Sequence, residues 1–170
     1  MNELMQYTHA VDVIKQAIEQ SRYRASKSVN SEMLSLYYGI GKYVSENIRN
    51  GEWGTDAIRQ ISKRLRKELP GLRGYSETNI KYMRLFYENW HDHVNRQPTA
   101  DDSEVDGKML LVEIRQPLAD DLNWSEFLSL SFSHHIEIIT KTETFDERSF
   151  YIHECAVHAW DKSQYISFDT

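Results

Sequence analysis

Basic side chains are concentrated in one short stretch of a chain that is acidic as a whole. Between Arg49 and Arg84 the sequence has nine Lys or Arg residues and four Asp or Glu residues, although the net charge of all 170 residues is −6 at pH 7. Because ammonium and guanidinium groups attract phosphates, an acidic protein can bind a polyanion through one such segment. Charge alone leaves a second interpretation open, in which these cations are the solvated face of ordinary helices.

Other residue types that could carry chemistry lack the spacing that it needs. The seven histidines suggest a metal site, but His153 and His158 would lie about 140° apart around a helix instead of on one face. Asp106 and Lys108 match only part of a nuclease metal motif, and the lone Cys155 fits an apolar helix face, together with Ile152 and Ala159, better than a nucleophile site. The sequence therefore predicts no metal site, no cofactor and no catalytic residue in this chain.

The composition favours one soluble helical domain. The chain has 40% hydrophobic and 27% charged residues, with only three Pro and seven Gly. Its length is typical of a single domain, and few Pro and Gly favour long helices over a loop-rich fold. No apolar run approaches the roughly 18 residues of a membrane span, and the N-terminus has no secretory signal pattern. We expect no membrane association and a bacterial-type cytoplasmic location, which the single Cys also fits.

Hydrophobic periodicity predicts an all-α, multi-helix bundle. We expect a first helix from about Thr8 to Lys27 and a second helix that Ser31 caps. The paired glycines Gly39 and Gly41 in this second helix predict the close approach of a neighbouring helix, because their spacing fits no phosphate-binding fingerprint. The further helices are expected at about 56–69, 76–90, 120–130, 133–142 and 146–160. An acidic surface loop is expected at about 92–107, and the run 109–114 fits a helix or a strand equally.

The two helices in the middle of the basic stretch raise the question of a helix-turn-helix. The first of them has the apolar stripe Ile58, Ile61, Leu65 and Leu69, and it should end at Pro70-Gly71. Thr55 or Asp56 should cap its start, and Ser76 should cap the next helix. In that next helix the expected core positions are Ile80, Met83, Phe86 or Tyr87, and Trp90. The pattern fits both a nucleic-acid-binding helix-turn-helix and two bundle helices joined by an ordinary turn.

Three stretches of the chain resemble a known family. They are Leu36-Tyr37-Tyr38-Gly39-Ile40-Gly41-Lys42, Trp53 through Pro70, and Gly74 through Tyr87, and a downstream segment at 114–164 extends the likeness. Together they are similar to the N-terminal domain, of unknown function, of YhcG-type bacterial proteins, in which this domain precedes a PDDEXK-superfamily nuclease domain. The family part would span about 8–165 of a single domain at 1–170. Tyr38 replaces the usual Trp, and the chain stops near Gln164, where the family continues, so the resemblance implies no nuclease domain and no nuclease activity here.

The resemblance implies an all-helical, helix-turn-helix-like module that assists DNA recognition or assembly for an attached nuclease. In such a unit the N-terminal residues of the recognition helix face the groove, and the preceding helix and turn contact phosphates. On this template the residues facing the groove are Thr78, Asn79, Lys81 and Arg84. Those facing the backbone are Arg59, Lys63, Arg66, Lys67 and Arg73. Asn and Arg can bind adenine and guanine through two hydrogen bonds each.

Two functions therefore stay open for this sequence. A DNA-binding module requires Lys63, Arg66, Arg73, Lys81 and Arg84 to form one continuous positive surface. An oligomerisation or partner-docking domain instead requires exposed aromatic anchors, for which Trp53, Trp90 and Trp124 are the candidates. The expected partners are DNA, a PDDEXK nuclease domain in cis or in trans, and a second copy of the chain, since helix-turn-helix proteins often dimerise.

Overall fold

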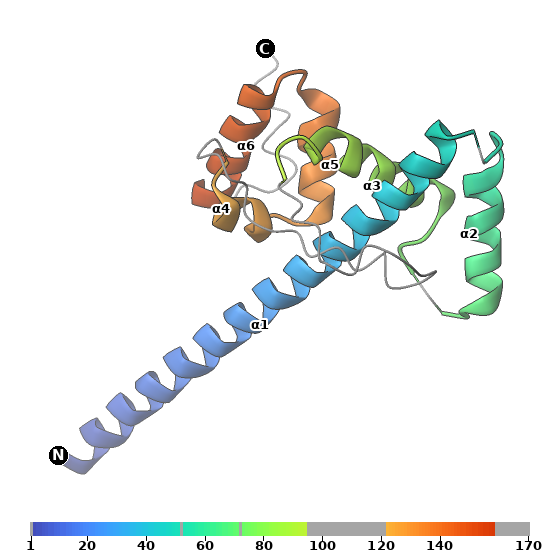
Figure 1. Cartoon of the computed structure of the whole chain (residues 1–170). Helices are drawn as coiled ribbons and strands as arrows, with labels where there is room; N and C mark the ends of the chain where they lie inside the picture. Colours follow the sequence, from blue (N-terminus) through green and yellow to red (C-terminus); the bar gives the residue numbers. More distant parts are fainter. Residues whose placement is uncertain (1, 52, 72, 95–121, 159–170) are drawn as a thin grey trace, which may run out of the picture.

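All regular secondary structure in the described part of the chain is helical, which confirms the all-α prediction (Figure 1). The computed structural model describes residues 2–51, 53–71, 73–94 and 122–158, with side chains from residue 25 onward. Its helices are α1 (Asn2–Arg49), α2 (Ala57–Glu68), α3 (Glu77–Trp90), α4 (Trp124–Ser129), α5 (Phe132–Lys141) and α6 (Phe145–His158). In this part of the chain, no helix combines the length and the hydropathy that a membrane span requires.

The first helix is continuous, so the predicted break between Lys27 and Ser31 is wrong. Ser31 lies inside α1 and caps nothing. Residues 27–31 include no Pro or Gly, and the Asn30 side chain forms its hydrogen bonds outside the helix. Its Nδ2 donates to the carbonyl oxygens of Leu128 and Leu130, both at 2.8 Å. Because this amide bonds across the fold, it does not compete with the backbone hydrogen bonds of the helix, which is the usual reason that Asn disfavours helix interiors. The N-terminal half of α1 extends away from the other helices (Figure 1).

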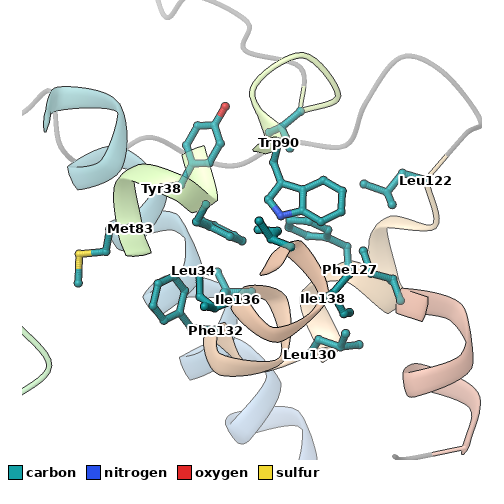
Figure 2. Close-up of a cluster of buried hydrophobic side chains, with 14 of the residues drawn as sticks. Leu34, Tyr38, Met83, Trp90, Leu122, Phe127, Leu130, Phe132, Ile136 and Ile138 are labelled. Carbon is teal, nitrogen blue, oxygen red and sulfur yellow. The ribbon is translucent and has the colours of Figure 1, made fainter. Parts of the chain in front are cut away.

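The main core lies where the C-terminal half of α1 meets α3, α4, α5 and α6. Figure 2 shows Leu34 and Tyr38 of α1 converging with Trp90 of α3, Phe127 of α4 and Ile138 of α5. Each of these side chains is buried. Trp90 is fully buried, which contradicts its candidacy as an exposed anchor, because its ring packs edge-on against Phe127 at 5.1 Å.

Gly41 allows α1 and α3 to approach each other closely, as the glycine pair predicts. A Cβ at Gly41 would overlap the carbonyl oxygen of Met83 and lie 2.6 Å from the carbonyl carbon of that residue. Gly39 is buried in the same stretch of α1. Helices that cross at such short range need a residue without a side chain at the contact. This contact brings the middle of α3 against the C-terminal half of α1.

A second, smaller cluster holds α2 against the rest of the fold. It consists of Val44 of α1, Ile58 of α2 and Ile80 of α3, with Ile61 and Leu65 partly buried beside it. Three of the four predicted stripe residues therefore pack inward. The fourth, Leu69, is 52% exposed because α2 ends at Glu68 and Leu69 is already its C-cap.

The remaining elements follow the sequence closely where the structure describes them. Ser76 caps α3 by accepting a hydrogen bond from the Asn79 backbone N–H at 3.2 Å, and α3 ends at Trp90 as expected. Of the three C-terminal helices, α4 lies within its predicted range, and α5 and α6 each begin one residue earlier than predicted. Cys155 is buried beside Ile152 in α6. The acidic loop from residue 95, the run 109–114, the residues Asp106 and Lys108, and Ala159 lie outside the described residues.

Candidate nucleic-acid interface

One face of α2 carries four of the predicted phosphate-binding residues. Arg59, Lys63, Arg66 and Lys67 fall within about 100° of one another around the helix. All four side chains are exposed, whereas Ile58 and Ser62 on the adjoining side are buried. The burial of that side therefore turns the four cations outward together, and we call them the α2 basic face.

The cations of the α2 basic face differ in how far they are neutralised. Arg59 pairs with Asp56 at 2.7 Å, and Arg66 reaches the Ser62 hydroxyl at 3.4 Å. Lys63 and Lys67 form no ion pair with any residue that the structure describes. Hydrogen bonds from Gln60 and Arg59, followed by the charges of Arg59 and Lys63, lower the pKa of the Asp56 carboxyl.

Asp56 stands at the N-cap position of α2 but does not cap it, so that prediction is only half right. Its backbone is helical rather than extended, and its side chain makes no cap hydrogen bond. The carboxylate instead accepts a hydrogen bond from Gln60 at 2.7 Å and binds Arg59. A carboxylate near a helix N-terminus is still stabilised by the helix dipole.

Ser62 fixes the position of α2 relative to the turn before α3. Its side chain is fully buried, and its hydroxyl donates to the Tyr75 carbonyl oxygen at 2.9 Å. The residues between the two helices, 69–76, include Gly71 and Gly74 with positive φ. This connection is longer than the three or four residues typical of a helix-turn-helix, so the helix-turn-helix-like unit stays a prediction.

Replacing Ser62 by Ala should lower the free energy of unfolding by about 1 to 2 kcal/mol, because the Tyr75 carbonyl would lose its partner in a buried place. Urea unfolding followed by circular dichroism measures this change. The matched control is Ser125→Ala, at an exposed position of α4. Equal stabilities of the two variants would contradict a positioning role for the Ser62 hydroxyl.

The predicted groove-facing residues lie along α3 and differ in their exposure and in their binding partners. Thr78 is exposed near its N-terminus. Asn79 is partly buried, and its Nδ2 donates to the Gly74 carbonyl oxygen at 3.2 Å, so this amide supports the turn. Lys81 binds Glu77 at 2.7 Å, and Arg84 binds Glu88 at 2.8 Å through Nε. Reading of bases by these residues stays a prediction.

Glu88 connects α1 to α3 at the end of this surface. Its Oε1 accepts hydrogen bonds from the Ser45 hydroxyl at 2.7 Å and from Arg84, and Arg49 lies 3.8 Å away. Partial burial raises the pKa of the Glu88 carboxyl, but the hydrogen bonds from Ser45 and Arg84 and the charges of Arg84 and Arg49 outweigh this effect, and the net pKa is lowered. Glu88 is therefore an anion that holds Arg84 in place.

Some of the predicted contact residues share one exposed surface, whereas others are paired with acidic side chains. The α2 basic face is one surface, and Arg73 is exposed in the connection after it without a described ion-pair partner. Lys81 and Arg84 lie on α3 beside acidic partners. Sequence reasoning missed Ser45 and Glu88. The four-residue spacing of Arg84 and Glu88 signals their pair, but only the fold brings Ser45 to it.

Comparison with known proteins places the chain in a family. The family description "DUF1016 N-terminal domain" matches residues 13–167. The curated protein "Putative nuclease YhcG" of Escherichia coli (strain K12) is 29% identical over 168 residues, which cover 93% of this chain and 43% of that protein. The chain thus spans less than half the length of this relative. No solved structure matches the chain. Because the family match covers nearly all of its residues, the chain belongs to the DUF1016 N-terminal domain family.

Proposed function

We propose that this domain is a non-catalytic DNA-binding module that positions an attached or partner nuclease domain. The observation that carries the proposal is the α2 basic face, in which Lys63 and Lys67 are exposed and form no ion pair with a described residue. The nuclease in the name of the relative supports a nucleic-acid partner for this chain. The matched part of that relative is less than half of its length, and we propose that the nuclease activity lies in the unmatched part.

The paired cations can join this surface when DNA binds. Exposed ion pairs such as those of Arg59 with Asp56 and Lys81 with Glu77 contribute little to stability, so a phosphate can replace the carboxylate at little cost. Contacts to phosphates supply most of the affinity and release counterions, which makes the affinity strongly dependent on salt. Thr78 and Arg84 on α3 are the residues that would contact base edges.

Neutralising the α2 basic face should weaken DNA binding and flatten its salt dependence. We expect the double variant Lys63→Gln, Lys67→Gln to reduce the slope of log affinity against log salt by about two units, because each lost phosphate contact removes about one. The measurement is fluorescence anisotropy of a labelled mixed-sequence duplex over a salt series, together with circular dichroism to verify folding.

The matched control neutralises two cations elsewhere. Arg64 lies outside the α2 basic face, about 60° from Lys67 around the helix, and binds Glu68 at 3.5 Å. Lys141 binds Glu137 in α5 at 2.8 Å. The variant Arg64→Gln, Lys141→Gln should keep the slope of the wild-type protein. If the wild-type protein binds no DNA at low salt, or if both double variants change the slope equally, the proposal is wrong.

An apolar hollow favours the second candidate function, docking of a protein partner. It has a volume of about 440 Å³ and lies between α1, α2 and the connection before α3, with Tyr43, Trp53, Leu65, Leu69 and Tyr75 among its walls. Tyr43 and Leu69 are exposed large apolar side chains, of the kind found at interfaces. Sedimentation of the chain at increasing concentration tests the simplest partner, a second copy.

A further inference from the structure

A separate cavity of about 450 Å³ lies between the C-terminal end of α1, the α1–α2 connection and α3. Its apolar walls include Ile48, Trp53 and Leu85, and its polar lining includes Lys81, Arg84 and Glu88. The Trp53 and Tyr43 rings pack at a steep angle, with a centroid distance of 5.4 Å and an interplanar angle of 77°, so the indole is held by its neighbour. An aromatic wall with a few converging polar groups is typical of a small-ligand site.

The polar groups of this cavity have hydrogen-bonding capacity left over. Arg84 uses Nε to bind Oε1 of Glu88, and its two terminal NH₂ groups have no partner among the described residues. All contacts of Glu88 with described residues go to Oε1, which leaves Oε2 as an unused acceptor. A fixed donor and a fixed acceptor therefore stand next to each other, because one hydrogen bond joins their side chains.

We propose that this cavity receives one unstacked nucleobase, so that the domain prefers DNA with unpaired nucleotides over a continuous duplex. The inference rests on the proposed DNA-binding function and names its substrate class. Every base carries a donor beside an acceptor on its edge, which complements Glu88 Oε2 and the Arg84 NH₂ groups. The Trp53 indole offers a stacking surface, and Lys81 at the same cavity can bind the adjoining phosphate.

The location of the cavity favours a nucleotide over other ligands. Ile58 lines it from α2, and Arg59 follows Ile58 directly on the α2 basic face. The cavity and the first residue of that face therefore belong to the same turn of α2, which is within reach of one bound strand. A base inside a duplex is stacked and paired and cannot enter, whereas a base in a single strand is free to do so.

The test compares three labelled DNA molecules with the same number of phosphates under the same salt conditions. One is a blunt duplex, one carries a short single-stranded overhang, and one carries the same overhang with abasic nucleotides. We expect the wild-type protein to bind the overhang about tenfold more tightly than the blunt duplex, in line with the usual contribution of base–aromatic stacking. The abasic overhang should lose this preference, because it keeps the phosphates and lacks the bases.

A protein variant gives the second arm of the test. Trp53→Leu should abolish the preference for the overhang and leave blunt-duplex affinity within about twofold, since the α2 basic face is unchanged; thermal unfolding verifies that the variant is folded. If blunt and overhang DNA bind equally, or if the abasic overhang binds as well as the normal one, the nucleobase site is wrong and DNA binding through α2 still stands. If no DNA binds, both proposals fall.

Discussion

Gly41→Ala is expected to destabilise the domain by about 3 kcal/mol or more, because the added methyl group has no room between α1 and α3. The new Cβ would overlap the Met83 carbonyl group and lie 3.0 Å from the Cβ of Tyr87. The neighbour that would have to move is backbone, in the middle of α3, so the two helices must separate. The higher helix propensity of Ala, worth about 1 kcal/mol, offsets only part of this cost.

Urea unfolding of the variant followed by far-UV circular dichroism measures the change in the free energy of unfolding. Gly54→Ala is the matched control, because a Cβ at Gly54 meets nothing within 4 Å. We expect that control to remain within about 0.5 kcal/mol of the wild-type protein. If Gly41→Ala were equally harmless, α1 and α3 would not approach each other as closely as the structure shows.

The second large effect is a loss of stability as the pH falls, caused by His135. This side chain is fully buried, and its Nε2 lies 2.9 Å from the Phe127 carbonyl oxygen. A carbonyl only accepts, so Nε2 carries the hydrogen, and the bare Nδ1 has no hydrogen-bond partner among the residues that the structure describes. Protonation would place a charge and an unsatisfied donor among the rings of Phe86, Trp90 and Phe127.

Burial, with a smaller contribution from the charge of His134, lowers the pKa of His135 from 6.5 to about 4, although the hydrogen bond to Phe127 opposes this shift. Because the folded-state pKa is below that of the unfolded chain, the stabilising contribution is complete above pH 6.5 and is lost as the pH falls toward 4. A difference of this size corresponds to about 3 kcal/mol at pH 4.

The experiment compares urea unfolding of the wild-type protein and of His135→Gln at pH 7 and at pH 4. Glutamine cannot titrate, and its amide can still donate to the Phe127 carbonyl. We expect the wild-type protein to lose about 3 kcal/mol more than the variant over this interval. Carboxylates such as Glu88, with a lowered pKa, also lose stabilisation in acid, but they are common to both proteins and cancel in the difference. Equal losses would show that His135 is not buried in its neutral form.

The helices that the sequence predicted best are those whose signals are local. Ser76 and the period of Ile80, Met83, Phe86 and Trp90 defined α3 from cap to end, since capping and amphipathicity both depend on near neighbours in the chain. The continuous α1 could not be predicted in this way. The hydrogen bonds that satisfy Asn30 come from residues about 100 positions away, and no window of sequence around residue 30 contains them.

In the candidate site, too, the features set by local sequence were predictable and those set by distant residues were not. The α2 basic face was predictable, because four cations spaced at helical intervals beside an apolar stripe must project together from the helix. The cavity beside Trp53 was not, because it requires α1, the α1–α2 connection and α3 to meet. The hydrogen bond of the Asn79 side chain was also not predictable. It depends on the positive φ of Gly74, and the local sequence alone does not specify the shape of that connection.

The small cluster that holds α2 has a consequence for how the domain comes apart. α2 is attached by Val44, Ile58 and Ile80 and by one buried hydroxyl, whereas α1 and α3 share the large aromatic core with the C-terminal helices. Local opening proceeds first where few apolar side chains are buried. Detachment of α2 should therefore cost less free energy than opening of the aromatic core, and it carries the positive charges with it. A ligand that bridges α2 to α3 would suppress this local opening. Its binding would therefore slow the hydrogen exchange of backbone amides in α2, while exchange in the core stays the same.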